Sequence, residues 1–176
     1  MSFLENLKNI TTFIFDVDGV LTNGSVLATE SGELLRSFNI KDGYALQLAK
    51  KKGYHICIIS GSTGKAMEQR FANLGLTDVH LGVGHKMEVF EAYLAKHQIT
   101  PDQVLYMGDD VPDHEVMKAV GIAASPLDAV DEIKQVAHYI SPRKGGDAAA
   151  RDVIEKVLRV QQNWFDANPS AVDSSR

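Results

Sequence analysis

Short apolar runs alternate with amphipathic stretches along this chain, and this alternation constrains the fold more than any other feature. The runs are mostly continuous rather than alternating with polar residues, at 12–15, 55–59, 79–81 and 104–107, with weaker ones at 121–123 and 139–140. Continuous runs are typical of strands that are covered on both faces. Helical spacing lies between them, as in Met67, Phe71 and Leu74 at i, i+4 and i+7. The order predicts an α/β fold with three layers, a parallel sheet with helices on both faces.

The starts of several helices are also predicted. Ser125 followed by Pro126 is typical of an N-cap with proline at the first helical position, so a helix is expected to begin there. Another helix is expected to begin near Ser62, with its positive end toward Ser60, and the last to span 147–160.

One segment breaks the alternation. Two stretches that contain apolar residues, 25–28 and 34–38, flank a polar turn that contains Gly32, a pattern that predicts a β-hairpin. We therefore expect a hairpin insertion at about 24–38, directly after the first strand, and no cap domain.

Length and composition limit the function classes. The 176 residues fit one domain, placed at 1–162, with a flexible polar tail at 163–176 in which Trp164 and Phe165 are candidates for docking. Eighteen Lys and Arg against 23 Asp and Glu give a net charge of −5, which disfavours nucleic-acid binding. One cysteine, Cys57, excludes a disulfide framework. Because no signal peptide or membrane span is evident, we expect a cytoplasmic protein without membrane association.

Polar residues gather where the predicted strands end, and ligands of an open parallel sheet bind beyond the carboxyl ends of its strands. The residues there are one hydroxyl, one ammonium and five carboxylates: Ser60, Lys86, Asp16, Asp18, Asp109, Asp110 and Asp113. Crowded carboxylates repel one another and need a cation, and oxygen ligands without His or Cys favour Mg²⁺. Mg²⁺ with few protein ligands implies a phosphate that completes its coordination. The sequence therefore predicts a Mg²⁺ site that binds a phosphate.

The spacing of Asp16 and Asp18 predicts different roles for the two carboxylates. Residues i and i+2 of a strand face the same side, and a turn at Gly19 then carries the second carboxylate to the far side of a bound phosphate. One acid can attack phosphorus to form an aspartyl-phosphate while the other protonates the leaving oxygen. Lys86 would neutralise the nucleophile and the phosphate as a point charge.

These residues resemble the motifs of the haloacid dehalogenase superfamily. The four matching motifs are Asp16-Val17-Asp18-Gly19-Val20-Leu21-Thr22, Ser60-Gly61, Lys86 and Gly108-Asp109-Asp110-Val111-Pro112-Asp113, in the superfamily's order. Over roughly residues 8–160 the chain resembles the small capless 3-deoxy-D-manno-octulosonate 8-phosphate phosphatases. Further matching stretches are Lys41-Asp42-Gly43-Tyr44 and Gly145-Gly146.

The resemblance implies a Rossmann-like, Mg²⁺-dependent phosphatase of lipopolysaccharide sugar synthesis. It implies a homotetramer in which the inserted hairpins form a barrel at the centre and a neighbouring subunit helps to cover the site. Asp16 is then the nucleophile, and Asp18 the general acid and later the base. Mg²⁺ is held by Asp16, by the main-chain carbonyl of Asp18 and by Asp109.

The other matched residues have supporting roles. The residues expected to contact phosphate or substrate are Lys86, Ser60, Gly61, Ser62 and Asp42. For Asp42, capping of a helix is an equally good explanation. Asp110 and Asp113 are expected to fix the loop rather than to bind the ion.

Two positions depart from the family pattern. Ser62 stands where the family commonly has Arg, and Asp147-Ala148 stand where it commonly has Arg-Gly. Both lie where family members contact the sugar acid. We therefore predict a phosphomonoesterase for a small acidic sugar phosphate, with 3-deoxy-D-manno-octulosonate 8-phosphate as first candidate and a nonulosonate (sialic-type acid) 9-phosphate as the alternative.

A non-catalytic signalling or oligomerisation module is the alternative of another class. Receiver domains also combine clustered acids, Mg²⁺ and a lysine, but their phosphorylated Asp follows the third strand, whereas Asp16 follows the first predicted one.

Overall fold

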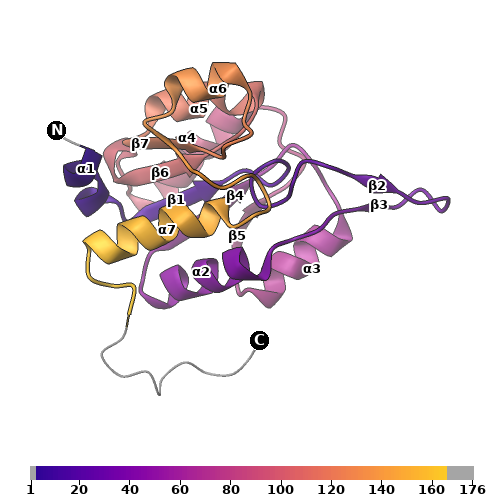
Figure 1. Cartoon of the computed structure of the whole chain (residues 1–176), viewed down its shortest axis with the longest axis horizontal. Helices are drawn as coiled ribbons and strands as arrows, with labels where there is room; N and C mark the ends of the chain where they lie inside the picture. The colour runs from indigo at the N-terminus through magenta and orange to yellow at the C-terminus, as the bar shows by residue number, and fades with distance from the viewer. Residues whose placement is uncertain (1–2, 166–176) are drawn as a thin grey trace.

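The computed structural model, which describes residues 3–165, has a six-stranded parallel sheet at its centre (Figure 1). The strands, in their order across the sheet, are β5 (Asp78–His80), β4 (His55–Ile59), β1 (Thr12–Phe15), β6 (Val104–Met107), β7 (Ile122–Ser125) and β8 (Tyr139–Ile140). Every neighbouring pair is parallel. The predicted fold class is therefore confirmed.

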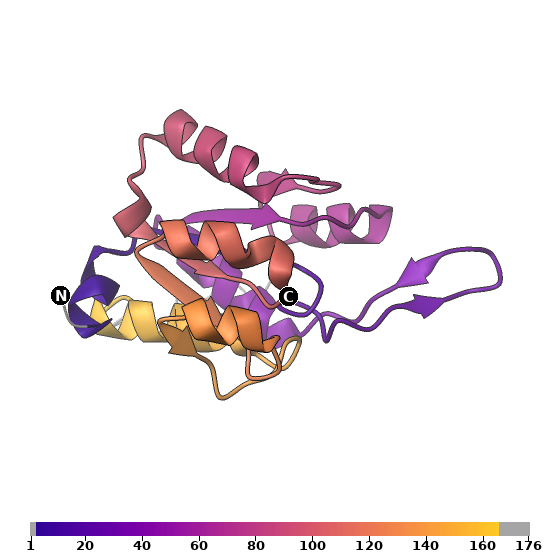
Figure 2. The same cartoon turned by 90° about the horizontal axis from the view of Figure 1, so that it is seen from above.

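Helices cover both faces of this sheet, as Figure 2 shows from above. One layer contains α1 (Phe3–Asn9), α2 (Ile40–Lys51), α3 (Lys65–Asn73) and α7 (Ala149–Val160). The other contains α4 (Lys86–His97), α5 (His114–Ala119) and α6 (Asp131–Val136). Two short 3₁₀ helices, η1 (Pro101–Gln103) and η2 (Val111–Asp113), flank β6. Among the described helices, none combines the length and apolar character that a membrane crossing requires.

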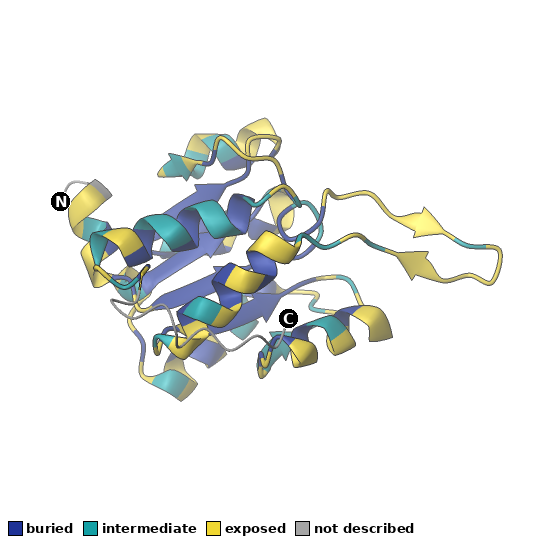
Figure 3. Cartoon of the chain, turned by 60° about the horizontal axis from the view of Figure 1, so that its bottom comes forward, coloured by how far each residue is buried: buried dark blue, intermediate teal, exposed yellow. Residues whose placement is uncertain are grey.

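The central strand β1 shows why the apolar runs are continuous. Phe13 and Phe15 pack with α2, α3 and α7, whereas Ile14 packs with α4 on the opposite face. All three side chains are fully buried, and the sheet is the buried layer in Figure 3. Both faces of the strand therefore require apolar side chains.

The predicted insertion is an antiparallel hairpin of β2 (Leu27–Ala28) and β3 (Leu34–Leu35). It projects from the end of the body (Figures 1 and 2), and its leucines are exposed, Leu27 by 67% and Leu34 by 57%. No cap domain is present in the described part of the chain.

Three predicted helix starts are wrong. Ser125 is the last residue of β7, because its carbonyl accepts a hydrogen bond from the Ser141 amide after β8, and the next helix begins only at Asp131. The helix expected near Ser62 begins at Lys65. The last helix begins at Ala149 instead of 147.

The start of the predicted C-terminal tail packs on the body. Trp164 is 6% exposed, and its ring lies 6.4 Å from that of Tyr44 and 5.2 Å from the guanidinium of Arg151. The remaining tail, 166–176, lies outside the described residues, and the boundary at 162 stays a prediction.

Candidate active site

The two central strands bring the main carboxylates together. Asp16 follows β1 and Asp109 follows β6, and these strands pair side by side with Phe15 opposite Met107. Asp16, Asp109 and Asp113 each offer a carboxylate oxygen, and these oxygens lie within 4.8 Å of one another. Asp16 is 7% exposed and Asp113 1%. The structure thus places three of the five predicted carboxylates in one cluster.

Two glycines allow the loops around this cluster to approach so closely. Gly19 has φ +87°, and a Cβ there would lie 1.9 Å from Oδ2 of Asp109. A Cβ on Gly145 would lie 1.9 Å from the carbonyl oxygen of Gly19. The Gly145-Gly146 pair therefore packs against the loop that follows Asp16.

Lys86, the first residue of α4, lies between two of the carboxylates. Its Nζ is 3.0 Å from Oδ1 of Asp16 and 2.7 Å from Oδ1 of Asp113. Burial alone would lower the pKa of Lys86, but the charges of Asp113 and Asp16 outweigh it and raise that pKa. Lys86 is therefore a buried ammonium beside the predicted nucleophile.

Both carboxylate oxygens of Asp113 accept hydrogen bonds from the protein. Its Oδ1 accepts a hydrogen bond from the Tyr106 hydroxyl at 2.5 Å as well as from Lys86. Its Oδ2 accepts from the backbone amides of Asp109 at 3.2 Å and Asp110 at 3.4 Å. This arrangement agrees with the expectation that Asp113 fixes the loop.

The remaining carboxylates suit a cation. Burial, and then the charge of Asp113, raises the pKa of Asp16 from 3.8 to about 6. Burial, followed by the charges of Asp16 and Asp113, raises the pKa of Asp109 to about 8. Oδ1 of Asp109 is buried without a hydrogen-bond partner among residues 3–165. A divalent cation bound to oxygen ligands would satisfy this atom and offset the repulsion, so the residues fit Mg²⁺.

Asp18 is held apart from the cluster by residues on other elements. Arg36, just after β3, donates from Nε to Oδ1 at 2.7 Å and from Nη2 to Oδ2 at 3.0 Å. The hydroxyl of Ser62 donates to Oδ2 at 2.6 Å. Although burial acts to raise the pKa of Asp18, the hydrogen bonds from Arg36 and Ser62 lower it.

The other predicted residues occupy different surroundings. Ser60 is 1% exposed, and its Oγ accepts from the amide of Ser62 at 3.2 Å, just beyond β4. Gly61 follows it in the same loop. Asp110 accepts from the amide of Val111 at 2.7 Å and so caps η2.

Asp42 serves the start of α7. It is 2% exposed, and its Oδ1 accepts from the Arg151 amide at 2.7 Å. Burial raises its pKa to about 6 despite the hydrogen bonds from the backbones of Arg151 and Ala148. Its hydrogen bonds therefore join it to α7, in line with the capping explanation, and not to Asp16 or Asp18.

Comparison with known proteins identifies the family. The model of haloacid dehalogenase-like hydrolases matches residues 80–152. The 3-deoxy-D-manno-octulosonate 8-phosphate phosphatase of Yersinia pestis is 35% identical over 158 residues, which cover 90% of this chain and 84% of that protein. The Escherichia coli K12 enzyme is 35% identical over 165 residues, 94% of this chain and 88% of that one.

The chain belongs to the family of 3-deoxy-D-manno-octulosonate 8-phosphate phosphatases.

Solved structures of family members have the same fold. The crystal structure of the Yersinia pestis phosphatase superposes with a TM-score of 0.90, covering 92% of this chain and 87% of that one at 35% identity. That of the Moraxella catarrhalis phosphatase, in complex with a magnesium ion, a phosphate ion and a KDO molecule, gives a TM-score of 0.89 at 29% identity and covers 92% of each chain. The chain is thus an enzyme of the phosphoric monoester hydrolase class, as the motifs predicted.

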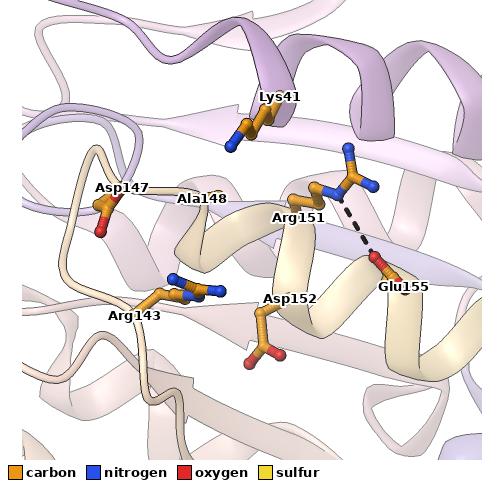
Figure 4. Close-up of a pocket in the computed structure, with 7 residues that line it drawn as sticks. All are labelled: Lys41, Arg143, Asp147, Ala148, Arg151, Asp152 and Glu155. Atoms are coloured by element: carbon orange, nitrogen blue, oxygen red, sulfur yellow. Dashed lines mark hydrogen bonds and ion pairs between the residues drawn. The ribbon is translucent and has the colours of Figure 1, made fainter.

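One of the two departures from the family pattern lies in a separate polar pocket of about 440 Å³ (Figure 4). It is lined by Lys41, Arg143, Asp147, Ala148, Arg151, Asp152 and Glu155, without any residue of the carboxylate cluster. Arg151 pairs with Glu155 at 3.3 Å across one helical turn. Asp147 thus adds an acid where the family commonly has a cation.

Sequence reasoning missed two residues of the site, Arg36 and Tyr106. Arg36 belongs to no motif and follows an exposed hairpin. Tyr106 lies in an apolar run and is indistinguishable from core by its pattern. The turn from β6 into η2 brings Asp113 back to Tyr106, and the folded hairpin brings Arg36 to Asp18.

Proposed function

We propose that this chain is a Mg²⁺-dependent phosphatase that hydrolyses 3-deoxy-D-manno-octulosonate 8-phosphate to the free sugar acid and inorganic phosphate. The observation that carries the proposal is the buried contact of Lys86 with Asp16. Asp16 lies next to Asp109 in the carboxylate cluster, and Asp18 follows it two positions later in the sequence. This arrangement supplies a nucleophile, a cation and a metal-binding carboxylate at one sheet edge. The identity with phosphatases of that substrate supports the choice of sugar.

The reaction has two steps. A carboxylate oxygen of Asp16 attacks phosphorus, the bond between phosphorus and the sugar oxygen breaks, and Asp18 gives its proton to that oxygen. Asp18 then takes a proton from water, which attacks the aspartyl-phosphate and releases phosphate, so that Asp16 and Asp18 return to their starting states. Protonation of Asp18 removes its charge and weakens its pair with Arg36, so protonation and release from Arg36 favour each other.

The metal and phosphoryl group are held by different residues. Asp16, Asp109 and the main-chain carbonyl of Asp18 would hold Mg²⁺. Asp113 would not, because its two carboxylate oxygens already accept hydrogen bonds from four donors. Bound there, Mg²⁺ would neutralise charge on the phosphoryl oxygens. Lys86 and the hydroxyl of Ser60 bind the phosphoryl group.

Phosphate release from a panel of sugar phosphates, with Mg²⁺ or with EDTA, tests the proposal. We expect Mg²⁺-dependent turnover that is greatest for octulosonate 8-phosphate, and a loss of at least about 10³-fold in Asp16→Asn with an unchanged circular dichroism spectrum. If a nonulosonate 9-phosphate were turned over faster, the proposed substrate would be wrong, whereas the proposed reaction would stand. Undiminished activity in Asp16→Asn would refute the mechanism.

The assembly and location of the enzyme complete the proposal. We infer a homotetramer, because the exposed leucines of the β2–β3 hairpin are apolar surface that a neighbouring subunit would cover. The single cysteine, Cys57, is buried and free, which suits a cytoplasmic enzyme.

A further inference from the structure

Tyr106 lies in the middle of the sheet, on β6 between β1 and β7 (Figure 1). Its side chain is fully buried among the apolar residues that face α4 and α5. A tyrosine hydroxyl at such a position needs a partner, because an unpaired buried donor is costly. The partner is Oδ1 of Asp113, at 2.5 Å.

That oxygen is shared with the catalytic lysine. Nζ of Lys86 lies 2.7 Å from Oδ1 of Asp113 and 3.0 Å from Oδ1 of Asp16. One ammonium group is therefore divided between a carboxylate that fixes the loop and the predicted nucleophile. A change in the position or charge of the Asp113 carboxylate therefore changes where this ammonium lies.

The Tyr106 hydroxyl is placed to control the orientation of the Asp113 carboxylate. It occupies one side of Oδ1, while the amides of Asp109 and Asp110 hold the other oxygen. These contacts fix the plane of the carboxylate and leave one direction from Oδ1 for Lys86. Without the hydroxyl, the carboxylate gains freedom to turn and draws the ammonium away from Asp16.

The geometry points to Tyr106 as a positioning residue that acts through Asp113 to hold Lys86 against Asp16 and the phosphoryl group. This inference rests on the proposed phosphatase activity and goes beyond it, since the Tyr106 hydroxyl is bonded to Asp113 and not to the proposed metal ligands Asp16 and Asp109. A displacement of about 1 Å at a reacting centre can cost about 10²-fold in rate, so the loss of one hydroxyl is expected to be visible in kcat.

The same core offers a matched control. Tyr93, on α4, is 3% exposed and packs in the same apolar cluster, but its hydroxyl has no hydrogen-bond partner among residues 3–165. Tyr93→Phe and Tyr106→Phe therefore remove the same group from the same core. Only the second one removes a contact with the Lys86 network.

The experiment measures kcat and KM of the full-length enzyme with Mg²⁺ and octulosonate 8-phosphate, and with 4-nitrophenyl phosphate as a second substrate. We expect Tyr106→Phe to lower kcat about 10-fold on both substrates, and Tyr93→Phe to leave kcat within about 2-fold. In a Lys86→Met background, Tyr106→Phe should change kcat less than about 2-fold, because the lysine through which it acts is gone. Thermal unfolding of every variant is measured in parallel.

The outcomes separate this inference from the proposed function. A wild type without Mg²⁺-dependent turnover of either substrate would overturn the proposed function and this inference with it. An active wild type in which Tyr106→Phe behaves like Tyr93→Phe, or loses the full 10-fold again in the Lys86→Met background, would overturn the inference alone.

If Tyr106→Phe does not fold, Asp113→Asn provides the second variant. With its amide oxygen toward Tyr106, the Asn side chain still accepts from that hydroxyl but offers Lys86 no charge, and its NH2 group replaces the oxygen that accepts from the amides of Asp109 and Asp110. A loss of kcat of at least about 10-fold that depends on the presence of Lys86 is expected. Wild-type kcat in Asp113→Asn would overturn the inference.

Discussion

At the scale of single residues, Ala148 has a backbone conformation that alanine adopts at a cost. Its φ is 66°, in the left-handed region, where the family commonly has glycine. Ala148→Gly should therefore raise the free energy of unfolding by about 1 kcal/mol. Urea unfolding measures the change. The control is Ala150→Gly, inside α7, which should lower it by about 1 kcal/mol. Equal destabilisation by both changes would contradict the argument.

Asp42 carries a pH dependence whose sign follows from its burial. Its pKa is raised from 3.8 in the unfolded chain to about 6 in the folded protein. Between these values the folded protein binds the proton more tightly, so the stability contributed by Asp42 is present at low pH and is lost as the pH rises toward 7. This difference in pKa corresponds to at most about 3 kcal/mol.

Asp42→Asn removes this ionisation and keeps an oxygen for the Arg151 amide. Relative to wild type, its free energy of unfolding should rise by up to about 3 kcal/mol from pH 4 to pH 7, measured by urea unfolding at each pH. An Asp42→Asn variant whose stability follows the wild-type pH profile would contradict this argument. Because Asp42 is bonded to α7, kcat is expected to stay within about 2-fold. A large loss of kcat would restore Asp42 as a substrate contact.

At the scale of elements, strands were more predictable than helix ends. Runs such as 55–59 identify strands because a doubly covered sheet requires apolar side chains on both faces. The Ser125-Pro126 signal was misleading, because pairing of β7 with β8 keeps Ser125 in the strand. Local capping preference is worth about 1 kcal/mol, and tertiary pairing outweighs it.

The same distinction applies to the site. Asp16 and Asp109 were predictable because each stands directly beyond a strand, and the sheet then sets their proximity. Arg36 was not, since its contact with Asp18 depends on how a hairpin folds back across 18 residues of sequence. Tyr106 was not, since its pattern is that of core. Residues that belong to local motifs can be predicted from the sequence, whereas the residues that position them through contacts in the folded chain cannot.

The β2–β3 hairpin leads to a prediction about assembly. Leu27 and Leu34 are exposed by 67% and 57%, on a hairpin that stands away from the body (Figure 3). Leu27→Glu with Leu34→Glu should convert a tetramer to smaller species in sedimentation velocity, because charge would have to be buried at the interface. The melting temperature of the dissociated subunit should not depend on these exposed positions.

Leu4→Glu is the matched control, since Leu4 is 62% exposed on α1 and not on the hairpin. It should remain tetrameric. A monomeric wild type, or an unchanged mass of the double variant, would contradict the prediction.

At the scale of the whole molecule, the proposed Mg²⁺ site joins the two central strands of the sheet. Asp16 follows β1 and Asp109 follows β6, so binding of an ion there stabilises the fold as a unit. At a free Mg²⁺ concentration of 100 times Kd, the free energy of unfolding should rise by about 2.7 kcal/mol relative to EDTA. Differential scanning calorimetry measures this, and Asp109→Asn should abolish most of the gain.

The same site predicts that Mg²⁺ binding releases protons in a pH-dependent way. The pKa of Asp109 is about 8 without the ion, so at pH 7 most molecules carry a proton there that the metal must displace. At pH 9 that proton is already absent. Titration calorimetry in two buffers of different ionisation enthalpy should therefore find release of about one proton at pH 7 and close to none at pH 9. The affinity for Mg²⁺ should rise with pH and level off above about 8.

Asp102→Asn, at an exposed position in η1, should leave both the proton release and the affinity unchanged. Equal proton release at the two pH values would mean that the ion is not bound by Asp109, and the assignment of the metal site would have to move to other carboxylates.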